Sequence, residues 1–234
     1  MKTTTTRPVV TREQWNEARI ALLKREKAAT HERDAISAAR RSLPMVKVEK
    51  SYVFEDAAGK SSLVGLFSGK SQLITYHFMF DPSWDAACKA CSFLADTFGP
   101  NVVHLAACDI AFVAVSRASV AKIEAYKKRM GWSFRWLSSA NTDFNVDYHA
   151  TIRADDAAAS YNYGKAPHGA GEMPGCSVFL RSEKDVFHTY STYGRGLDVL
   201  MGAYNYIDLA PLGRNEATGE NMKWLRRHDE YQER

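Results

Sequence analysis

Apolar residues recur every seven positions near the start of the chain, a spacing typical of an amphipathic helix. The row consists of Trp15, Leu22, Ala29 and Ile36. Thr11 and Gln14 have the spacing of a capping box and Pro44 ends the pattern, so we predict one long helix between them. Charged residues interrupt the complementary row, which leaves the stripe narrow. We therefore expect a helical arm, residues 1–44, that lies across the domain or a partner subunit, and our hypothesis is a homodimer contact.

After residue 44 the pattern alternates between short apolar runs and amphipathic stretches. The runs at 72–80, 110–115 and 133–139 are short and rich in β-branched and aromatic residues, which predicts strands. Periodicity predicts helices at 88–98, closed by Gly99-Pro100, at 120–130 and at 196–210. A polar loop is expected at 141–150, and a hairpin that joins 176–180 to 185–193. These elements predict an α/β domain, residues 45–234, with a mixed central sheet flanked by helices on both faces.

The composition is that of an ordinary globular protein, with 45% hydrophobic and 25% charged residues over 234 positions. The apolar runs are too short to span a bilayer, and the N-terminus has no apolar core of signal-peptide length. We therefore expect a cytoplasmic protein with no membrane partner. Residues 1–50 hold 12 Lys and Arg against 6 Asp and Glu. Because acidic residues are interleaved and no nucleic-acid-binding motif is present, we interpret this excess as a solvated helix face and expect no nucleic-acid partner.

The stretch SWDAACKACSFLADTFG, residues 83–99, places Cys88 and Cys91 at the start of a predicted helix, after a strand and a loop. In an intracellular protein such a pair is more often catalytic or metal-binding than part of a disulfide framework. Positions i and i+3 lie on one side of a helical turn. The first sulfur then lies at the helix N-terminus, where unpaired N–H groups lower the thiol pKa. This geometry predicts Cys88 as the attacking thiolate and Cys91 as the resolving thiol.

Two other interpretations of the cysteines are open. Cys88, Cys91, His104 and Cys108 follow the order Cys-x2-Cys-x12-His-x3-Cys, which has the spacing of a small zinc site. We expect the segment from His104 to Cys108 to be extended and its two side chains to lie too far apart for one ion, so we predict no metal. Free cysteines are also often buried as small hydrophobic residues, which is our expectation for Cys108 and Cys176.

Several segments resemble a bacterial family of unknown function: SLPMVKVEKSYVFED at 42–56, CKACSFLAD at 88–96, VVHLAACDIAFVAVSRA at 102–118 and TYSTYGRGLDVLMGAYNYIDLAPLGRNE at 189–216. Its members are thioredoxin-like proteins described by inference as dithiol–disulfide oxidoreductases. The resemblance implies a thioredoxin-like fold with peroxiredoxin-like additions, and it places the motif cysteines on Cys88 and Cys91. It also implies a cis-proline opposite the motif. Pro174 is the candidate, with an ordinary loop turn as the alternative.

Departures from related families limit the chemistry that the resemblance implies. Lys89-Ala90 separates the cysteines where thioredoxin has Gly-Pro, so a reduction potential is not carried over. A peroxiredoxin has Thr or Ser three residues before its peroxidatic cysteine, and Asp85 occupies that position. We predict thiol–disulfide exchange with a protein or small-molecule substrate; a redox-silent binding or assembly protein and a thiol peroxidase are the alternatives. No dinucleotide or phosphate-binding fingerprint occurs in the sequence, so no bound cofactor is implied.

Other polar residues have two interpretations each. His77 in the predicted central strand and His104 before the next strand are candidates for proton transfer from Cys91, or else hydrogen-bonded core histidines. Asp81 and Asp85 are either proton acceptors near the pair or turn residues. Ion pairing or capping is the expected role of two later arginines, Arg195 and Arg214.

Overall fold

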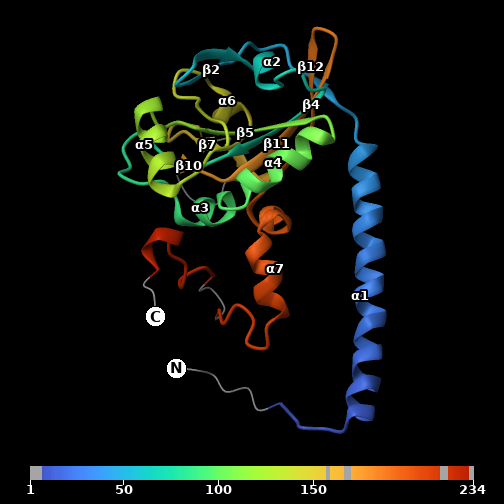
Figure 1. Cartoon of the computed structure of the whole chain (residues 1–234). Helices are drawn as coiled ribbons and strands as arrows, with labels where there is room; N and C mark the ends of the chain where they lie inside the picture. The colour runs from blue at the N-terminus through green and yellow to red at the C-terminus, as the bar shows by residue number, and fades with distance from the viewer. Residues whose placement is uncertain (1–6, 157–158, 166–169, 217–220, 232–234) are drawn as a thin grey trace. The chain divides into compact units, whose positions relative to one another are not determined.

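The computed structural model describes residues 7–156, 159–165, 170–216 and 221–231 and divides the chain into two compact units, Met1–Pro44 and Met45–Arg234. The first unit holds one long helix, α1 (Arg12–Arg41), drawn in blue in Figure 1. Thr11 Oγ1 accepts a hydrogen bond from the Gln14 amide and Gln14 Oε1 accepts one from the Thr11 amide, so the predicted capping box is confirmed. The predicted apolar row is exposed, with Trp15 at 49% and Leu22 at 47%.

The second unit is built on an eight-stranded sheet in the order β1-β12-β11-β4-β5-β6-β2-β3. The central strands β4 (Gln72–His77), β5 (Ile110–Ser116) and β6 (Trp136–Ser138) are parallel. The hairpin of β11 (Gly175–Ser182) and β12 (Asp185–Tyr193) pairs antiparallel with β4. Short strands extend both edges, namely β1 (Val46–Lys47), β2 (Val53–Asp56) and β3 (Gly59–Ser62). The predicted strands and the predicted hairpin are confirmed.

Helices connect the parallel strands. α3 (Lys89–Ala95) and α4 (Phe98–Ala107) join β4 to β5, and α5 (Val120–Met130) joins β5 to β6. α5 ends, as predicted, at Gly131, whose φ of +65° is the left-handed conformation that glycine adopts without steric cost. Parallel β4, β5 and β6 with these crossovers, beside an antiparallel hairpin on β4, form a thioredoxin-like fold. The predicted fold class is thereby confirmed.

Smaller elements complete the described part of the domain. They are α2 (Leu63–Leu66), α6 (Phe144–Asp147), α7 (Gly202–Leu209), the 3-10 helices η1 (Gly194–Leu200) and η2 (His228–Glu230), and the strand pairs β7 (Thr151–Ile152) with β10 (Gly171–Glu172) and β8 (Ser160–Tyr161) with β9 (Gly164–Lys165). Within the ranges that the structure describes, no helix has both the length and the apolar character needed to cross a membrane.

Alternation along β4 divides the core between the two faces of the sheet, because successive side chains of a strand point to opposite sides. Tyr76 belongs to one buried cluster, together with residues of α3, α4, α5 and α7. Leu73 belongs to the other cluster, with residues of α2 and α6. In Figure 1, α2 and α6 accordingly lie on one side of the sheet and α3 lies on the other. The two predicted helix-covered faces are present, and Cys91 lies in the first cluster.

The region after the cysteine helix differs from the prediction. Gly99 and Pro100 do not close a helix but lie in the first turn of α4. Proline is tolerated there because the amides of the first turn have no partner within the helix. His104 is therefore helical and exposed, not part of an extended segment. The sequence-based argument against a zinc site assumed that the segment from His104 to Cys108 is extended, and this assumption is wrong.

Two further expectations about local structure are corrected. The expected polar loop at 141–150 contains the short helix α6, because Phe144 is fully buried and anchors it. The helix expected at 196–210 is broken at Met201, whose φ and ψ of −88° and 79° are not helical. η1 precedes the break and α7 follows it, and Leu200 just before the break is 40% exposed.

Candidate active site

Cys88 and Cys91 lie at the start of α3, where the chain returns from the loop that follows β4. Cys88 is the N-cap residue, and its amide donates to the carbonyl oxygen of Met79 at 3.1 Å. Cys91 lies inside the helix and is 1% exposed, whereas Cys88 is only partly buried. Both thiols are free. One sulfur is therefore accessible and the other lies in the core beneath it.

The two thiols have opposite acidities. A hydrogen bond from the Cys91 thiol is the largest factor that lowers the pKa of Cys88, to about 6. The backbone amides of Cys91 and Ala90 and the positive charge of Arg227 act in the same direction, against the effect of burial. Burial raises the pKa of Cys91 well above its ordinary value, and its contact with Cys88 adds to this. At neutral pH Cys88 is thus the thiolate and Cys91 the thiol.

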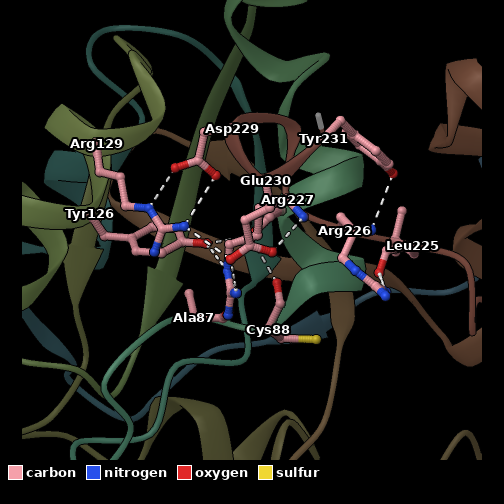
Figure 2. Close-up of polar contacts among 11 residues, drawn as sticks. Ala87, Cys88, Tyr126, Arg129, Leu225, Arg226, Arg227, Asp229, Glu230 and Tyr231 are labelled. Carbon is pink, nitrogen blue, oxygen red and sulfur yellow. Dashed lines mark hydrogen bonds and ion pairs between the residues drawn. The ribbon is translucent and has the colours of Figure 1, made fainter. Parts of the chain in front are cut away.

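Arg227 reaches this helix start from the C-terminal end of the chain, as Figure 2 shows. Its Nη2 donates to the carbonyl oxygen of Ala87 at 2.7 Å, and its Nε donates to Tyr126 Oη at 2.8 Å. Its side chain is only 15% exposed. Tyr126 Oη in turn lies 2.9 Å from Ser92 Oγ, and Ser92 Oγ donates to the Cys88 carbonyl. Arg227 is therefore fixed beside the reactive thiol by α3 and α5.

The segment that carries Arg227 is itself held by ion pairs. Glu230 accepts from Arg227 Nη1 at 2.7 Å and from Arg129 Nη2 at 3.1 Å. Arg129 also contacts both carboxylate oxygens of Asp229, as Figure 2 shows. His228 Nδ1 lies 2.7 Å from an oxygen of Asp96, at the end of α3. No motif or periodicity in the sequence marks Arg227, so sequence reasoning did not identify it.

Tyr76 of β4 lies beneath the pair, on the same face of the sheet. Its hydroxyl contacts the Cys91 thiol, and burial raises the pKa of Tyr76 well above its ordinary value. The phenol therefore stays protonated beside the resolving sulfur. The alternation of β4 indicates which of its residues share a face, but not that Tyr76 is the residue beneath Cys91.

Pro174 lines the same cavity as the two cysteines, and its peptide bond differs from the expectation. The Met173–Pro174 bond is trans, so the predicted cis-proline is wrong. The proline directly precedes β11, and Tyr161 Oη donates to its carbonyl oxygen at 2.8 Å. The same hydroxyl accepts from the Gly194 amide at 2.9 Å. Tyr161 therefore provides, without any cis bond, a link between Pro174 and the start of η1.

A cavity of about 320 Å³ adjoins both sulfurs. Pro174 and Gly194 form part of its wall, and further walls come from η1, α7 and the segment that follows. Arg195 and Arg214 also line it, and both make the ion pairs expected of them: Arg195 with Asp198 at 3.0 Å, and Arg214 with Asp208 at 2.7 Å. The reactive thiol therefore lies at a half-open cavity.

His77 lies on the other face of the sheet from the cysteines and is fully buried. Its Nε2 lies 2.9 Å from Ser177 Oγ, its Nδ1 lies 3.4 Å from Asn145 Oδ1, and its ring stacks on Phe144. Burial lowers the pKa of His77 to about 4, so the ring is neutral at pH 7. Of the two interpretations, the hydrogen-bonded core histidine is confirmed, and proton transfer from Cys91 by His77 is wrong.

Glu172 is a second buried ionisable group away from the sulfurs. Its carboxylate is 1% exposed, accepts from Thr151 Oγ1 at 3.0 and 3.1 Å, and lies 3.2 Å from Arg117 Nη1. Burial raises the pKa of Glu172 to about 7, against the effect of the Arg117 charge. Asp81 has the turn role, because it accepts from the amide and hydroxyl of Ser83.

The two cysteines outside the motif differ in burial. Cys176 is buried, as expected, and burial raises its pKa to about 12. Cys108 is exposed at the end of α4, so the expectation of a buried residue is wrong there. Within the described ranges, three or more His, Cys, Asp or Glu side chains nowhere gather in a group that could hold a metal, and the Cys88–Cys91–His104–Cys108 set is included in that statement.

Three solved structures illustrate what the chain is similar to. Peroxiredoxin Q from Xanthomonas campestris is 11% identical, with a TM-score of 0.45 over 66% of this chain and 90% of that one. Peroxidoxin BcpB from Mycobacterium tuberculosis is 14% identical, with a TM-score of 0.46 over 70% and 97%. A hypothetical protein from Sinorhizobium meliloti is 17% identical, with a TM-score of 0.41 over 71% and 82%. All three similarities are distant.

No curated protein matches the sequence. A family profile, however, covers almost all of it, from residue 4 to residue 231, and thus includes the helical arm, both motif cysteines and Arg227. The chain therefore belongs to the family described as bacterial protein of unknown function (DUF899).

Proposed function

We propose that this protein is a dithiol–disulfide oxidoreductase in which Cys88 attacks and Cys91 resolves. The observation that carries the proposal is the contrast between the two sulfurs. Cys88 is accessible with a pKa lowered to about 6, and Cys91 is buried one helical turn away with a raised pKa. Dithiol exchange needs one thiolate nucleophile and one thiol held in reserve within disulfide reach.

The reaction proceeds in two exchanges. The Cys88 thiolate attacks one sulfur of the substrate disulfide; a Cys88–substrate bond forms, the substrate S–S bond breaks, and one half leaves as a thiolate that takes a proton from water. Cys91 then attacks Cys88 Sγ; the Cys88–substrate bond breaks, and the second half leaves as a thiolate that takes up the proton that Cys91 gives up. The substrate gains two electrons and the Cys88–Cys91 disulfide forms. A small dithiol such as dithiothreitol returns the electrons in the assay.

The residues around Cys88 have distinct roles in this scheme. The amides of Ala90 and Cys91 and the charge of Arg227 favour the thiolate in the reduced protein. They also favour Cys88 as the leaving group when the Cys88–Cys91 disulfide is reduced, because a thiol of lower pKa leaves faster. Tyr76, protonated beside Cys91, is positioned to donate to that sulfur whenever it carries negative charge.

Reduction of insulin disulfides by dithiothreitol tests the proposal. Cys88→Ser should abolish the catalysed rate, by at least about a hundredfold, because no nucleophile remains. Cys91→Ser should accumulate a Cys88–substrate mixed disulfide that mass spectrometry detects. Cys108→Ser serves as the matched control, since Cys108 is exposed at the far end of α4, and should retain the full rate.

The same preparations separate the two alternatives. If the wild type reduces neither insulin nor a small organic disulfide faster than Cys88→Ser does, and Cys91→Ser forms no mixed disulfide, the proposal is contradicted and a redox-silent binding protein is favoured. Consumption of hydrogen peroxide that depends on Cys88 and exceeds the rate of disulfide reduction favours a thiol peroxidase instead.

A further inference from the structure

The cavity beside the two sulfurs is small and has largely apolar walls. At about 320 Å³ it lies at the lower end of the range for small-molecule sites and is too small for a folded protein substrate to enter. Apolar wall residues surround the position of the sulfurs, namely Tyr76, Met79, Leu197, Met201 and Met222. Methionine side chains adapt to irregular apolar partners because they are flexible and polarisable. The cavity wall is therefore suited to contact the aliphatic part of a small-molecule substrate.

The charged residues of the wall are already paired. Arg214 stacks on the Tyr204 ring at 3.6 Å, lies 2.7 Å from Asp208, and lies 3.7 Å from Asp198. Arg195 pairs with Asp198, and its side chain is 81% exposed, so its charge lies in solvent. Two arginines, Arg195 and Arg214, and two carboxylates, Asp198 and Glu216, line the cavity, so the positive and negative charges of its wall balance.

Glu216 is held in place by three donors on one carboxylate oxygen. Tyr204 Oη donates to it at 3.3 Å, the Met222 amide at 2.8 Å, and Trp224 Nε1 at 2.8 Å. Each charged side chain named here is thus paired or hydrogen-bonded. A carboxylate that entered it would have to displace an existing ion pair or lose its hydration without compensation, and both cost free energy.

We propose that the cavity selects small, uncharged organic disulfides with an aliphatic body and discriminates against anionic ones. This inference rests on the proposed dithiol chemistry, and the exchange steps are those given above, with the substrate released as two thiols. The aliphatic part contacts the methionine-rich wall and the disulfide faces Cys88. An acidic substituent would lose its hydration against a wall whose arginines are already paired with carboxylates.

The test compares dithiodipropionate with its dimethyl ester, two disulfides of the same skeleton that differ in charge. The second-order rate of each with the protein is divided by its rate with free dithiothreitol, which removes intrinsic reactivity. We expect the ester to be preferred by about tenfold or more after this correction. Met222→Lys, which places a cation in the wall, should reduce that preference. Val199→Lys adds the same charge at an exposed position of η1 outside the cavity lining and should not.

Insulin reduction measured in parallel distinguishes failure of the proposed substrate class from failure of the proposed oxidoreductase function. Equal corrected rates for ester and acid, or no Cys88-dependent reduction of the ester while insulin is reduced, overturn the substrate class and leave the oxidoreductase intact. Loss of all Cys88-dependent reduction, insulin included, overturns the proposed function itself.

Discussion

Arg227 Nη2 donates to the main-chain oxygen of Ala87 at 2.7 Å, although the two residues are 140 positions apart. Ala87 directly precedes Cys88, so this bond places a guanidinium charge next to the reactive sulfur at the very start of α3. The C-terminal segment is therefore a structural part of the candidate active site.

The first prediction concerns what lowers the Cys88 pKa. In a Cys108→Ser background, the pH midpoint of Cys88 alkylation by iodoacetamide should be about 6. Cys91→Ala should raise it furthest toward the ordinary value of 9.0, because the Cys91 hydrogen bond is the largest stabilising contribution. Arg227→Gln should raise it less, and Arg227→Lys least, since lysine retains the charge. Peptide mapping assigns the modified sulfur.

Arg227 also bonds to Tyr126 and Glu230, so a purely structural role has to be distinguished. Thermal unfolding of Arg227→Lys and Arg227→Gln provides that control. Two variants with equal stability but different Cys88 midpoints support the electrostatic role. Equal midpoints in the two variants and the parent contradict it.

The second prediction concerns Glu172 and the pH dependence of stability. Its pKa is about 7 in the folded protein against an ordinary value of 4.5, so between these values the folded state binds more protons than the unfolded state. The free energy of unfolding therefore falls as pH rises from about 4.5 to about 7, by on the order of 2–3 kcal/mol from this group.

Glu172→Gln removes that contribution. Urea unfolding of both proteins at intervals across the window measures it, and the wild type should lose stability relative to the variant as pH rises. The comparison is made between the proteins because His77, whose pKa is lowered to about 4, contributes with the opposite sign over part of the same window. A difference between the proteins that does not change with pH contradicts the prediction.

The third prediction is that His77 acts on stability and not on the chemistry. His77→Ala removes one buried hydrogen-bond partner each from Ser177 and Asn145 and opens a cavity, so we expect a loss of about 2–4 kcal/mol in unfolding free energy. His77→Gln retains polar atoms and should lose less. In both variants the Cys88 alkylation midpoint should stay where it is in the parent. A shifted midpoint in the folded Gln variant would connect His77 to the sulfurs after all.

The fourth prediction concerns the exposed apolar row of α1. We propose that it forms a contact with a second copy of the chain, since Trp15, Leu22 and Ile36 are each more than two-fifths exposed on one helix. Sedimentation of the full chain should then show a dimer. Leu22→Lys should shift it to the monomer, whereas Asn16→Lys, off the apolar row, should not. If the wild-type chain sediments as a monomer at high concentration, the proposed dimer contact is wrong.

Much of the fold was predictable from local patterns. The capping box at Thr11, the apolar runs of β4 and β5 and the glycine at the end of α5 each depend on neighbouring residues only, and each was confirmed. Errors occurred where local signals are ambiguous. A Gly-Pro pair such as Gly99-Pro100 often follows the end of a helix, but proline is also tolerated in the first turn of a helix, which is where it lies here. Phe144 within a polar stretch forms a helix only because the core accepts its ring.

By itself the sequence determined the central strands, the hairpin, helices α1 and α5, and the position of Cys88 and Cys91 at a helix start, because hydrophobic periodicity and helix-end signals act over a few residues. Tertiary structure alone decided what surrounds the sulfurs. It brought Arg227 to Ala87, turned His77 to the opposite face, kept the Pro174 bond trans and paired the charges around the cavity. Most of these features depend on residues that lie far apart in the chain. Local sequence patterns do not specify them, because such residues come together only when the folded core forms.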